Sequence, residues 1–217
     1  MIRRVLEWLF PRKCVLCRSF LSKEETDLCH KCRCDMPEYR YGRKKIPHVA
    51  DLTALWMYEG HVRQSLQRYK FYGARHYAAA YGRLLAMRIQ TDLPEPDVIT
   101  WVPVSDRRRR KRGFDQGELL ALAAAEELGI PAEKLLHKFR DNPPNSSLKT
   151  QPERRANVLG VYKAVQPERF RGKRVLLLDD IVTTGATASE CARVLMTAGA
   201  EEIIFAALAA AGNPSNK

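Results

Sequence analysis

Apolar residues form short continuous runs and helical patterns along most of the chain after residue 50. Runs that are almost wholly apolar are typical of parallel strands, because helices cover both faces of such a sheet. The predicted strands are Thr53–Tyr58, Val98–Val102, Val158–Lys163, Arg174–Leu178 and Glu202–Ala207. Apolar positions three and four residues apart predict helices at Val62–Phe71, Arg75–Gln90, Asp115–Leu128 and Ala186–Ala198. Strands that alternate with helices predict an α/β fold with a parallel sheet and right-handed crossovers.

The first fifty residues follow a different pattern. Residues 2–10 place their apolar side chains on one helical face, which fits packing against the rest of the protein or contact with a membrane surface. The segment Glu38–His48 is polar and basic and indicates a linker. We therefore expect an N-terminal cysteine-rich segment with an amphipathic helix (1–37), a basic linker (38–50) and an α/β domain (51–217).

Five of the six cysteines lie within the first 34 residues, and four of them form two CxxC pairs separated by 11 residues. A two-residue spacer lets both thiolates of a pair turn toward one ion, and two such pairs complete a tetrahedral shell of sulfur ligands. Redox-active pairs and isolated structural thiols are the alternatives. We predict a closed structural Zn²⁺ site that supplies folding energy to this short segment, with Cys34 or His30 as a substitute for the last ligand. The predicted ligands are Cys14, Cys17, Cys29 and Cys32.

The charge of the chain favours anionic partners. Lys and Arg number 37 against 25 Asp and Glu, which gives a formal net charge of +12. Nucleic acid, phosphorylated small molecules and anionic membranes are the partner classes that such a charge attracts. A hydrophobic content of 45% excludes a wholly disordered basic tail. No apolar run reaches membrane-spanning length and no export signal is visible, so we expect a cytoplasmic protein without an integral membrane segment.

The strongest chemical motif is the segment Val175–Thr187. Its apolar strand delivers two adjacent carboxylates, Asp179 and Asp180, to the strand's carboxyl end, where ligands bind in open parallel sheets. A turn at Thr183–Gly185 then opens a helix, and its backbone N–H groups, threonine hydroxyls and positive helix terminus suit a phosphate. Carboxylates beside it can accept hydrogen bonds from sugar hydroxyls. Together these groups predict a site for a 5-phosphorylated ribose.

Three other interpretations of this motif are weaker. An Asp pair after an apolar strand also occurs in P-loop ATPases, but the chain contains no GxxxxGK[ST] segment. A dinucleotide-binding fold requires GxGxxG, which is also missing. A purely structural turn would leave two neighbouring carboxylates without a role at the end of a strand.

Several segments of the chain resemble those of a known protein family. Val175–Thr187 resembles the phosphoribosyl pyrophosphate (PRPP) motif of type I phosphoribosyltransferases. Together with the four-cysteine segment and the stretch Val102-Pro103-Val104-Ser105…Arg112-Gly113-Phe114-Asp115-Gln116, it makes almost the whole chain similar to the ComF family of competence proteins. The resemblance implies a type I phosphoribosyltransferase-like domain preceded by a small zinc-ribbon-like finger.

The resemblance also implies roles for individual residues. Asp179 and Asp180 would be the catalytic carboxylates that contact the ribose hydroxyls, and Mg²⁺ would accompany PRPP. The polar, proline-broken segment Asn142–Asn157 indicates a loop and resembles the flexible loop that closes over the diphosphate in amidophosphoribosyltransferase-like enzymes. The residues expected to bind PRPP are Asp179, Asp180, Thr183, Thr184, Gly185, Ala186, Thr187, Ser105, Lys149 and Arg154.

A run of six cations, Arg107–Arg112, follows the strand that ends at Val102. It fits a grip on a diphosphate, a clamp on a nucleic-acid backbone, or a solvated charged loop. The segment Lys70–Arg75 mixes cations and aromatics. Packing is the favoured role for Phe71 and Tyr72, with base stacking as the alternative. The nucleic-acid candidates are Lys70, Arg107, Arg108, Arg109, Arg110, Lys111 and Arg112.

Two functional hypotheses follow. By its resemblance to ComF proteins, the protein would bind PRPP and single-stranded DNA and act in natural competence and DNA uptake, with a competence helicase as a partner. Alternatively, it would be an active phosphoribosyltransferase, a glycosyltransferase that joins the 5-phosphoribosyl group of PRPP to a nitrogen acceptor. The first hypothesis predicts binding with little turnover, whereas the second predicts release of pyrophosphate.

Overall fold

The computed structural model describes residues 11–39, 45–143 and 147–211. The predicted helix at residues 2–10 lies outside these ranges. The central feature is a parallel four-stranded sheet with the strand order β1-β6-β5-β2. Its strands are β1 (Asp51–Met57), β2 (Val98–Trp101), β5 (Arg174–Val182) and β6 (Glu202–Ala210). The predicted α/β fold with a parallel sheet is therefore confirmed.

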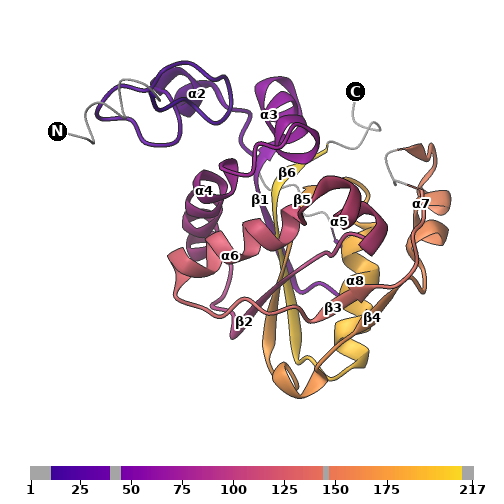
Figure 1. Cartoon of the computed structure of the whole chain (residues 1–217). Coiled ribbons are helices and arrows are strands. Elements are labelled where there is room, and N and C mark those ends of the chain that lie inside the picture. The colour runs from indigo at the N-terminus through magenta and orange to yellow at the C-terminus, as the bar shows by residue number, and fades with distance from the viewer. Residues whose placement is uncertain (1–10, 40–44, 144–146, 212–217) are drawn as a thin grey trace.

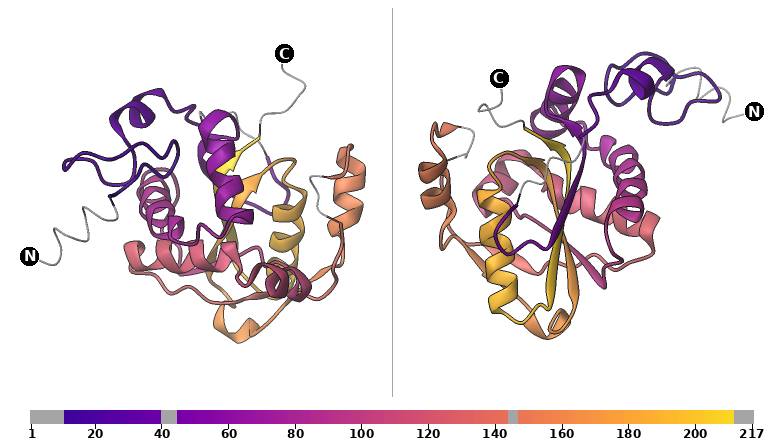
Figure 2. Two further views of the ribbon diagram at one scale, coloured as in Figure 1. Left: turned by 45° about the horizontal axis from the view of Figure 1, so that its top comes forward. Right: turned by 180° about the vertical axis from the view of Figure 1, so that it is seen from behind.

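Helices cover both faces of this sheet. Helices α4 (Tyr77–Asp92) and α6 (Gln116–Leu128) lie on one face, and α8 (Ala186–Thr197) lies on the other (Figure 1). The rear view in Figure 2 shows the strands between these two layers. The cause is the alternation along β5, where Leu176 and Leu178 join the core on the α4/α6 side while Val175 and Leu177 join the core on the α8 side.

Two further helices lie beside the carboxyl ends of the strands, and a third lies farther from the sheet. Helix α3 (Gly60–Phe71) and helix α5 (Asp106–Arg112) lie beside the ends of β5 and β6, whereas α7 (Gln151–Val158) stands apart from both (Figure 1). An antiparallel pair, β3 (Leu136–Lys138) with β4 (Tyr162–Ala164), forms the base from which the α7 segment extends. A short 3-10 helix, η2 (Pro167–Arg169), precedes β5.

Two segments differ from the sequence-based expectation because of helix caps. The Arg107–Arg112 run, expected as a loop, forms α5, whose first turn is capped by the Ser105 side chain. The expected loop Asn142–Asn157 contains α7, which starts with a capping box between Thr150 and Glu153. The predicted strand Val158–Lys163 is correspondingly wrong in its first half, since Val158 ends α7.

The cysteine-rich segment packs against α3 and α4. It contains the short helix α2 (His30–Asp35) and buries Val15 and Leu16 in the same core as α3. Arg68 on α3 donates to the Leu16 carbonyl at 2.5 Å, and the hydroxyl of Ser65 donates to the carbonyl of Val15. Figure 1 shows this segment at the α3 end of the molecule. Its contact with the α/β domain is therefore apolar and hydrogen-bonded.

An ion pair adds to this contact. Arg83 on α4 donates two hydrogen bonds to the carboxylate of Asp27, at 3.0 and 2.6 Å. On the carboxyl-terminal side of the segment, Tyr39 and Ile46 are buried among residues of the α8 side of the sheet.

The division of the chain at residues 38–50 stays a prediction. In the part of the chain that the structure describes, no helix is both long and apolar enough to cross a membrane.

Helices α4 and α6 approach each other so closely at Gly82 that no side chain fits there. A Cβ atom on Gly82 would lie 2.5 Å from the Cβ of Ala123. We expect Gly82→Ala to destabilise the fold by about 1–3 kcal/mol through overpacking, measured by urea denaturation. The control is Ala79→Gly at an exposed position of α4, where glycine should be less stable than alanine by about 1 kcal/mol. It measures the helix preference for alanine, which would by itself make Gly82→Ala stabilising. Stabilisation by Gly82→Ala would contradict the close approach.

Candidate functional site

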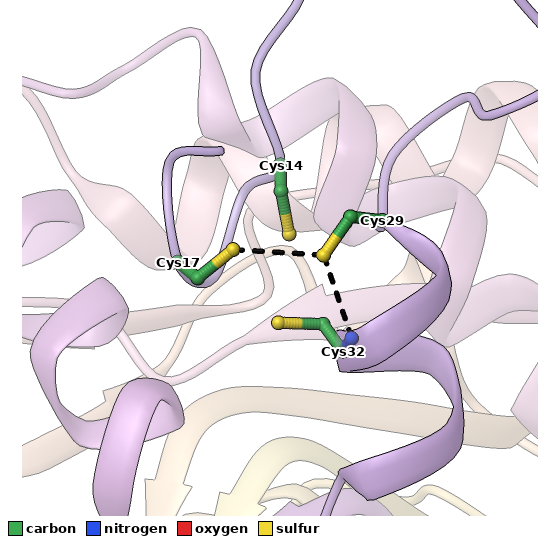
Figure 3. A group of neighbouring side chains, drawn as sticks. All are labelled: Cys14, Cys17, Cys29 and Cys32. Atoms are coloured by element: carbon green, nitrogen blue, oxygen red, sulfur yellow. Dashed lines mark hydrogen bonds between the residues drawn. The ribbon is translucent and has the colours of Figure 1, made fainter. Parts of the chain in front are cut away.

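Four cysteine sulfurs converge in the N-terminal segment. The Sγ atoms of Cys14, Cys17, Cys29 and Cys32 all lie within 4.8 Å of one another, and Figure 3 shows them pointing to a common centre. The Sγ atoms of Cys17 and Cys29 are 3.6 Å apart. A tetrahedral Zn²⁺ with bonds of about 2.3 Å places its sulfur ligands about 3.8 Å apart, so the arrangement fits zinc. Four thiolates leave no open position, which makes the fitted site structural.

The local fold explains why these cysteines meet. Cys29 caps helix α2, since its sulfur accepts the backbone N–H of Cys32 at 3.4 Å, and this contact holds the Cys29 side chain against the first turn of the helix that carries Cys32. Cys34 is exposed and its sulfur lies 3.7 Å from Nε2 of His30, outside the cluster. The structure therefore groups Cys32, and neither alternative ligand, with the other three.

The two carboxylates of the predicted sugar site lie where β5 reaches its carboxyl end. Asp180 is buried, and its carboxylate accepts hydrogen bonds from Lys70 Nζ at 2.8 Å and from Gln116 Nε2 at 3.2 Å. The carboxylate of Asp179 accepts the N–H of Asp180 at 2.8 Å. Burial and then repulsion from Asp180 raise the pKa of Asp179 well above its usual range. A ligand that supplies hydrogen-bond donors or a cation would relieve this repulsion.

The turn after β5 leads directly into helix α8. Gly185 adopts φ +80° and precedes the first residue of α8, a helix of 12 residues. A Cβ at Gly185 would approach Ile46 to 2.8 Å, so the close approach of Ile46 also requires glycine. The Thr184 hydroxyl accepts the N–H of Ala186 at 3.4 Å. The segment Thr183–Thr187 thus places the positive terminus of α8 next to the Asp pair.

The end of helix α3 is locked onto the same edge. Tyr69 is fully buried, and its hydroxyl donates to the Gln116 carbonyl at 2.7 Å. Lys70, predicted as a nucleic-acid contact, instead pairs with Asp180. Gln116 had no predicted role, although it closes the Arg-Gly-Phe-Asp-Gln stretch, and this stretch was the signal that could have revealed it. Asp180 therefore has one cationic and one amide partner from segments distant in the chain.

Ser105 and the first half of α5 are held by Asp141. The buried Ser105 hydroxyl donates to the Asp141 carboxylate at 2.6 Å. Ser105, which was expected to contact PRPP, is therefore already hydrogen-bonded within the protein. The guanidinium groups of Arg108 and Arg107 lie 3.6 and 3.7 Å from the same carboxylate. Arg108 also donates to the Asn142 carbonyl. Two of the six cations are thus partly neutralised within the protein.

The second half of α5 divides into paired and unpaired cations. Arg109 pairs with Glu118 at 3.0 Å, and Arg112 donates to the Gln116 side chain at 2.9 Å. Arg110 and Lys111 are exposed, and the structure gives them no side-chain partner among its described residues. An anionic ligand can therefore reach these two cations without breaking an internal contact.

Lys138, which was not predicted as a site residue, is a buried cation near the Asp pair. It ends β3 with 6% of its surface exposed, and its Nζ lies 5.3 Å from the centre of the Tyr162 ring. Burial, followed by repulsion from Arg108, lowers the pKa of Lys138 to about 8. A lysine directly after a histidine carries no sequence signal for such a position, and β3 itself is only three residues long.

The α7 segment carries the two remaining predicted PRPP contacts. Lys149 is exposed, and the guanidinium of Arg154 donates to the Leu148 carbonyl at 3.1 and 3.0 Å. Helix α7 packs near α8 but stands away from α3 and α5 in Figures 1 and 2. The structure therefore does not bring these cations against Asp179 and Asp180.

The aromatic residues divide into two groups. Trp56, Trp101 and Phe114 are buried. Phe71 and Tyr72 are 63% and 79% exposed, so the interpretation of these two as packing residues is wrong. They follow Lys70 at the end of α3, and the described residues leave most of both side chains uncovered.

Two family models match the chain in succession. The double zinc ribbon domain matches residues 5–43, which include the four clustered cysteines. The phosphoribosyl transferase domain matches residues 115–216, which include β5, the Asp pair and α8. The order of the two matches is the order of the cysteine cluster and the parallel sheet in the structure.

Curated relatives match nearly end to end. The DNA utilization protein YhgH of Salmonella typhi is 28% identical over 89% of this chain and 94% of its own. Competence protein F of Haemophilus influenzae is 26% identical over 89% and 95%, and competence protein ComFC of Bacillus subtilis is 25% identical over 86% and 78%. Among solved structures, the PRPP amidotransferase from B. subtilis is 26% identical, with a TM-score of 0.46, and covers 65% of this chain but only 30% of its own. With its zinc ribbon followed by a domain of the phosphoribosyltransferase fold, this chain belongs to the ComF family.

Proposed function

We propose that this protein binds PRPP at the carboxyl end of β5 and single-stranded DNA along α5, and that it acts in DNA uptake. One observation carries the first part: Asp179 and Asp180 lie directly beside the turn Thr183–Thr187 at the terminus of α8. The carboxylates suit ribose hydroxyls, and the turn suits the 5-phosphate. Lys70, 2.8 Å from Asp180, adds a cation at the same edge.

Mg²⁺ fits this proposal because carboxylate oxygens are ligands that it accepts. Asp179 and Asp180 would hold the ion, directly or through water, and the bound ion would neutralise charge on the diphosphate. The raised pKa of Asp179 supports the fit, since a nearby cation would favour the ionised carboxylate. A cation bound at this edge would also compete with Lys70, which pairs with Asp180 in the ligand-free protein.

The proposed role in DNA uptake is supported by the relatives and by charge. Proteins named for competence and for DNA utilization match this chain over most of their length. Helix α5 adds six adjacent cations, of which Arg110 and Lys111 are exposed without a described partner. A phosphate backbone is the polyanion that such a row binds without sequence preference. The competence helicase and the cytoplasmic location stay predictions from the sequence.

Neutralising α5 should make DNA binding less dependent on salt. For Arg110→Gln with Lys111→Gln, the slope of log affinity against log salt should become shallower by about 1.4, since each phosphate contact on a single strand contributes about 0.7. Fluorescence anisotropy with a labelled oligonucleotide measures this slope. Arg171→Gln with Lys173→Gln removes the same charge at the opposite end of β5 and is the control. An unchanged slope in the α5 variant would remove α5 from the proposal.

A second candidate function is phosphoribosyl transfer to a nitrogen acceptor. The observation that favours it is that Asp179 and Asp180 lie beside the turn that opens α8, with Lys70 paired to Asp180. Under this function, mixing PRPP, Mg²⁺ and an acceptor releases pyrophosphate, whereas the binding function gives affinity with little turnover. An assay of pyrophosphate release separates the two functions, and a PRPP titration in the presence of single-stranded DNA shows whether the two ligands compete for one site.

A further inference from the structure

Phe71 and Tyr72 form an exposed aromatic pair on a fixed part of the backbone. Their side chains are 63% and 79% exposed. The preceding residues are held firmly, since Tyr69 is fully buried and Lys70 pairs with Asp180. The N–H of Tyr72 donates to the Arg68 carbonyl at 3.0 Å and closes the last turn of α3. The two rings therefore project to solvent from a rigid helix end.

A cation already stacks on one of these rings. The Arg112 guanidinium carbon lies 5.0 Å from the centre of the Phe71 ring, and the same group donates to Gln116. This contact occupies part of the ring and leaves more than half of the side chain exposed. A ring that stacks on a cation has an electron-rich face, and a nucleobase stacks on such a face with support from the arginine.

Contacts between α3 and α5 fix the aromatic pair beside the cations. The Arg75 guanidinium lies over the Phe114 ring at 4.7 Å, so the turn after Tyr72 packs on the segment that follows α5. Gly113 ends α5 with φ +76°, and a Cβ there would approach Arg75 to 2.8 Å. The exposed cations of α5 and the exposed rings of α3 thus belong to one continuous surface.

This surface also borders the proposed sugar-phosphate site. Phe71 directly follows Lys70, which contacts Asp180, and its stacking partner Arg112 reaches Asp180 through Gln116. Exposed aromatics by themselves would also fit an apolar protein partner. Here Phe71 contacts Arg112 of α5, the helix that also carries the exposed Arg110 and Lys111, which favours a ligand with flat apolar rings joined by phosphates.

We propose that Phe71 and Tyr72 are a stacking platform for bases of a single-stranded nucleic acid, whose phosphates contact Arg110 and Lys111. The proposal rests on the proposed DNA binding and adds that the bases, and not only the backbone, are held. The platform is sequence-tolerant, because every nucleobase has a flat face. It lets the protein distinguish a single strand from a duplex, in which the base faces are already stacked.

The test compares an oligothymidylate with an abasic oligomer of the same length and charge. The wild-type protein should bind the oligothymidylate more tightly. In Phe71→Leu with Tyr72→Leu, affinity for the oligothymidylate should fall on the order of tenfold or more, as expected for lost base stacking. Affinity for the abasic oligomer and the salt slope should stay as in the wild type. Tyr72→Leu alone, which leaves the Arg112 contact intact, should give part of the loss.

Phe20→Leu is a matched control in the zinc-ribbon segment. Phe20 is 66% exposed and lies 5.2 Å from Lys13 Nζ, but no described contact joins it to Asp180. This variant should bind both oligomers as the wild type does. Circular dichroism and thermal unfolding show whether each variant is folded, since neither measurement depends on the exposed rings.

Several outcomes would overturn the platform. Equal affinity of the wild type for the two oligomers would show that bases are not held, while DNA binding itself stands. Free thymidine monophosphate that binds as tightly as the strand would assign the rings to a mononucleotide. Self-association of the wild type that the double variant lacks would assign them to a protein interface. Failure of the wild type to bind either oligomer would instead reject the proposed DNA binding.

Discussion

The double substitution Asp179→Asn with Asp180→Asn is expected to weaken PRPP binding by about a hundredfold or more. Each carboxylate would lose charge-assisted hydrogen bonds to ribose hydroxyls, worth about 1.5–3 kcal/mol apiece, together with its attraction for Mg²⁺. A loss of about 3–6 kcal/mol corresponds to roughly 10²- to 10⁴-fold in affinity. Isothermal titration calorimetry with PRPP and Mg²⁺ measures this change directly.

The substitution should leave the fold intact. The charge on Asp179 is unfavourable in the ligand-free protein, as its raised pKa shows, so an uncharged amide costs little there. An asparagine at position 180 keeps one acceptor oxygen for Lys70 or Gln116, and the Gln116 amide can rotate to present its oxygen to the new NH₂ group. Thermal unfolding should therefore change much less than ligand affinity does.

A matched control removes the same charge elsewhere. Asp35 and Asp106 are exposed, and Asp35→Asn with Asp106→Asn should bind PRPP as the wild type does. Equal binding by the wild type and the Asp179/Asp180 double variant would show that the sugar-phosphate site is assigned to the wrong residues. Equal loss in both variants would show that binding follows net charge alone.

Loss of zinc should have the second large effect, on stability. We expect Cys14→Ser to unfold the ribbon, because Cys14 is fully buried and its sulfur belongs to the four-cysteine cluster. Zinc binding in small metal-dependent domains contributes about 10–16 kcal/mol, which is comparable to the total stability of a typical domain, about 5–15 kcal/mol. Zinc content and susceptibility to trypsin measure the two parts of this expectation.

The damage should extend into the α/β domain. Val15 and Leu16 lie between the first two ligands and pack in the same core as Leu66 on α3. If the ribbon unfolds, this part of the core meets water, and Ser65 and Arg68 lose their carbonyl partners. The thermal unfolding midpoint of the whole chain should therefore fall.

Cys34→Ser is the control for this experiment. Cys34 is exposed beside His30 and outside the cluster, so the variant should retain equimolar zinc and wild-type stability. Loss of zinc from this variant, with retention in Cys32→Ser, would show that Cys34 replaces Cys32 as the ligand. Full stability of Cys14→Ser without metal would contradict a folding role for zinc.

The sequence by itself predicted the parts of this protein that depend on local pattern. The apolar run that follows Arg174 predicted the central strand β5, and the alternation of strands and helices predicted the parallel sheet. The two CxxC pairs predicted the cysteine cluster, because their spacing already turns two sulfurs of each pair to one side. In each case, residues close together in the chain contain the information.

Local signals were also missed where charge dominates the composition. Helices α5 and α7 were expected as loops, although Ser105 and Thr150 are good helix caps and Glu153 completes a capping box. A run of like charges argues against an isolated helix, and pairing with Asp141 and Glu118 offsets this repulsion only in the folded protein.

Only the tertiary structure decided the partners of the Asp pair and the exposure of the aromatics. Gln116 and Asp180 are 64 residues apart in the chain, yet their side chains meet because α6 covers the face of the sheet beside β5. Lys70 reaches the same carboxylate because α3 crosses the end of the strands. Phe71, one residue further along α3, is exposed for the same reason: the helix passes beyond the core at this point. The sequence determined which chemical groups the protein contains, and the packing of the helices on the sheet determined which of them act together.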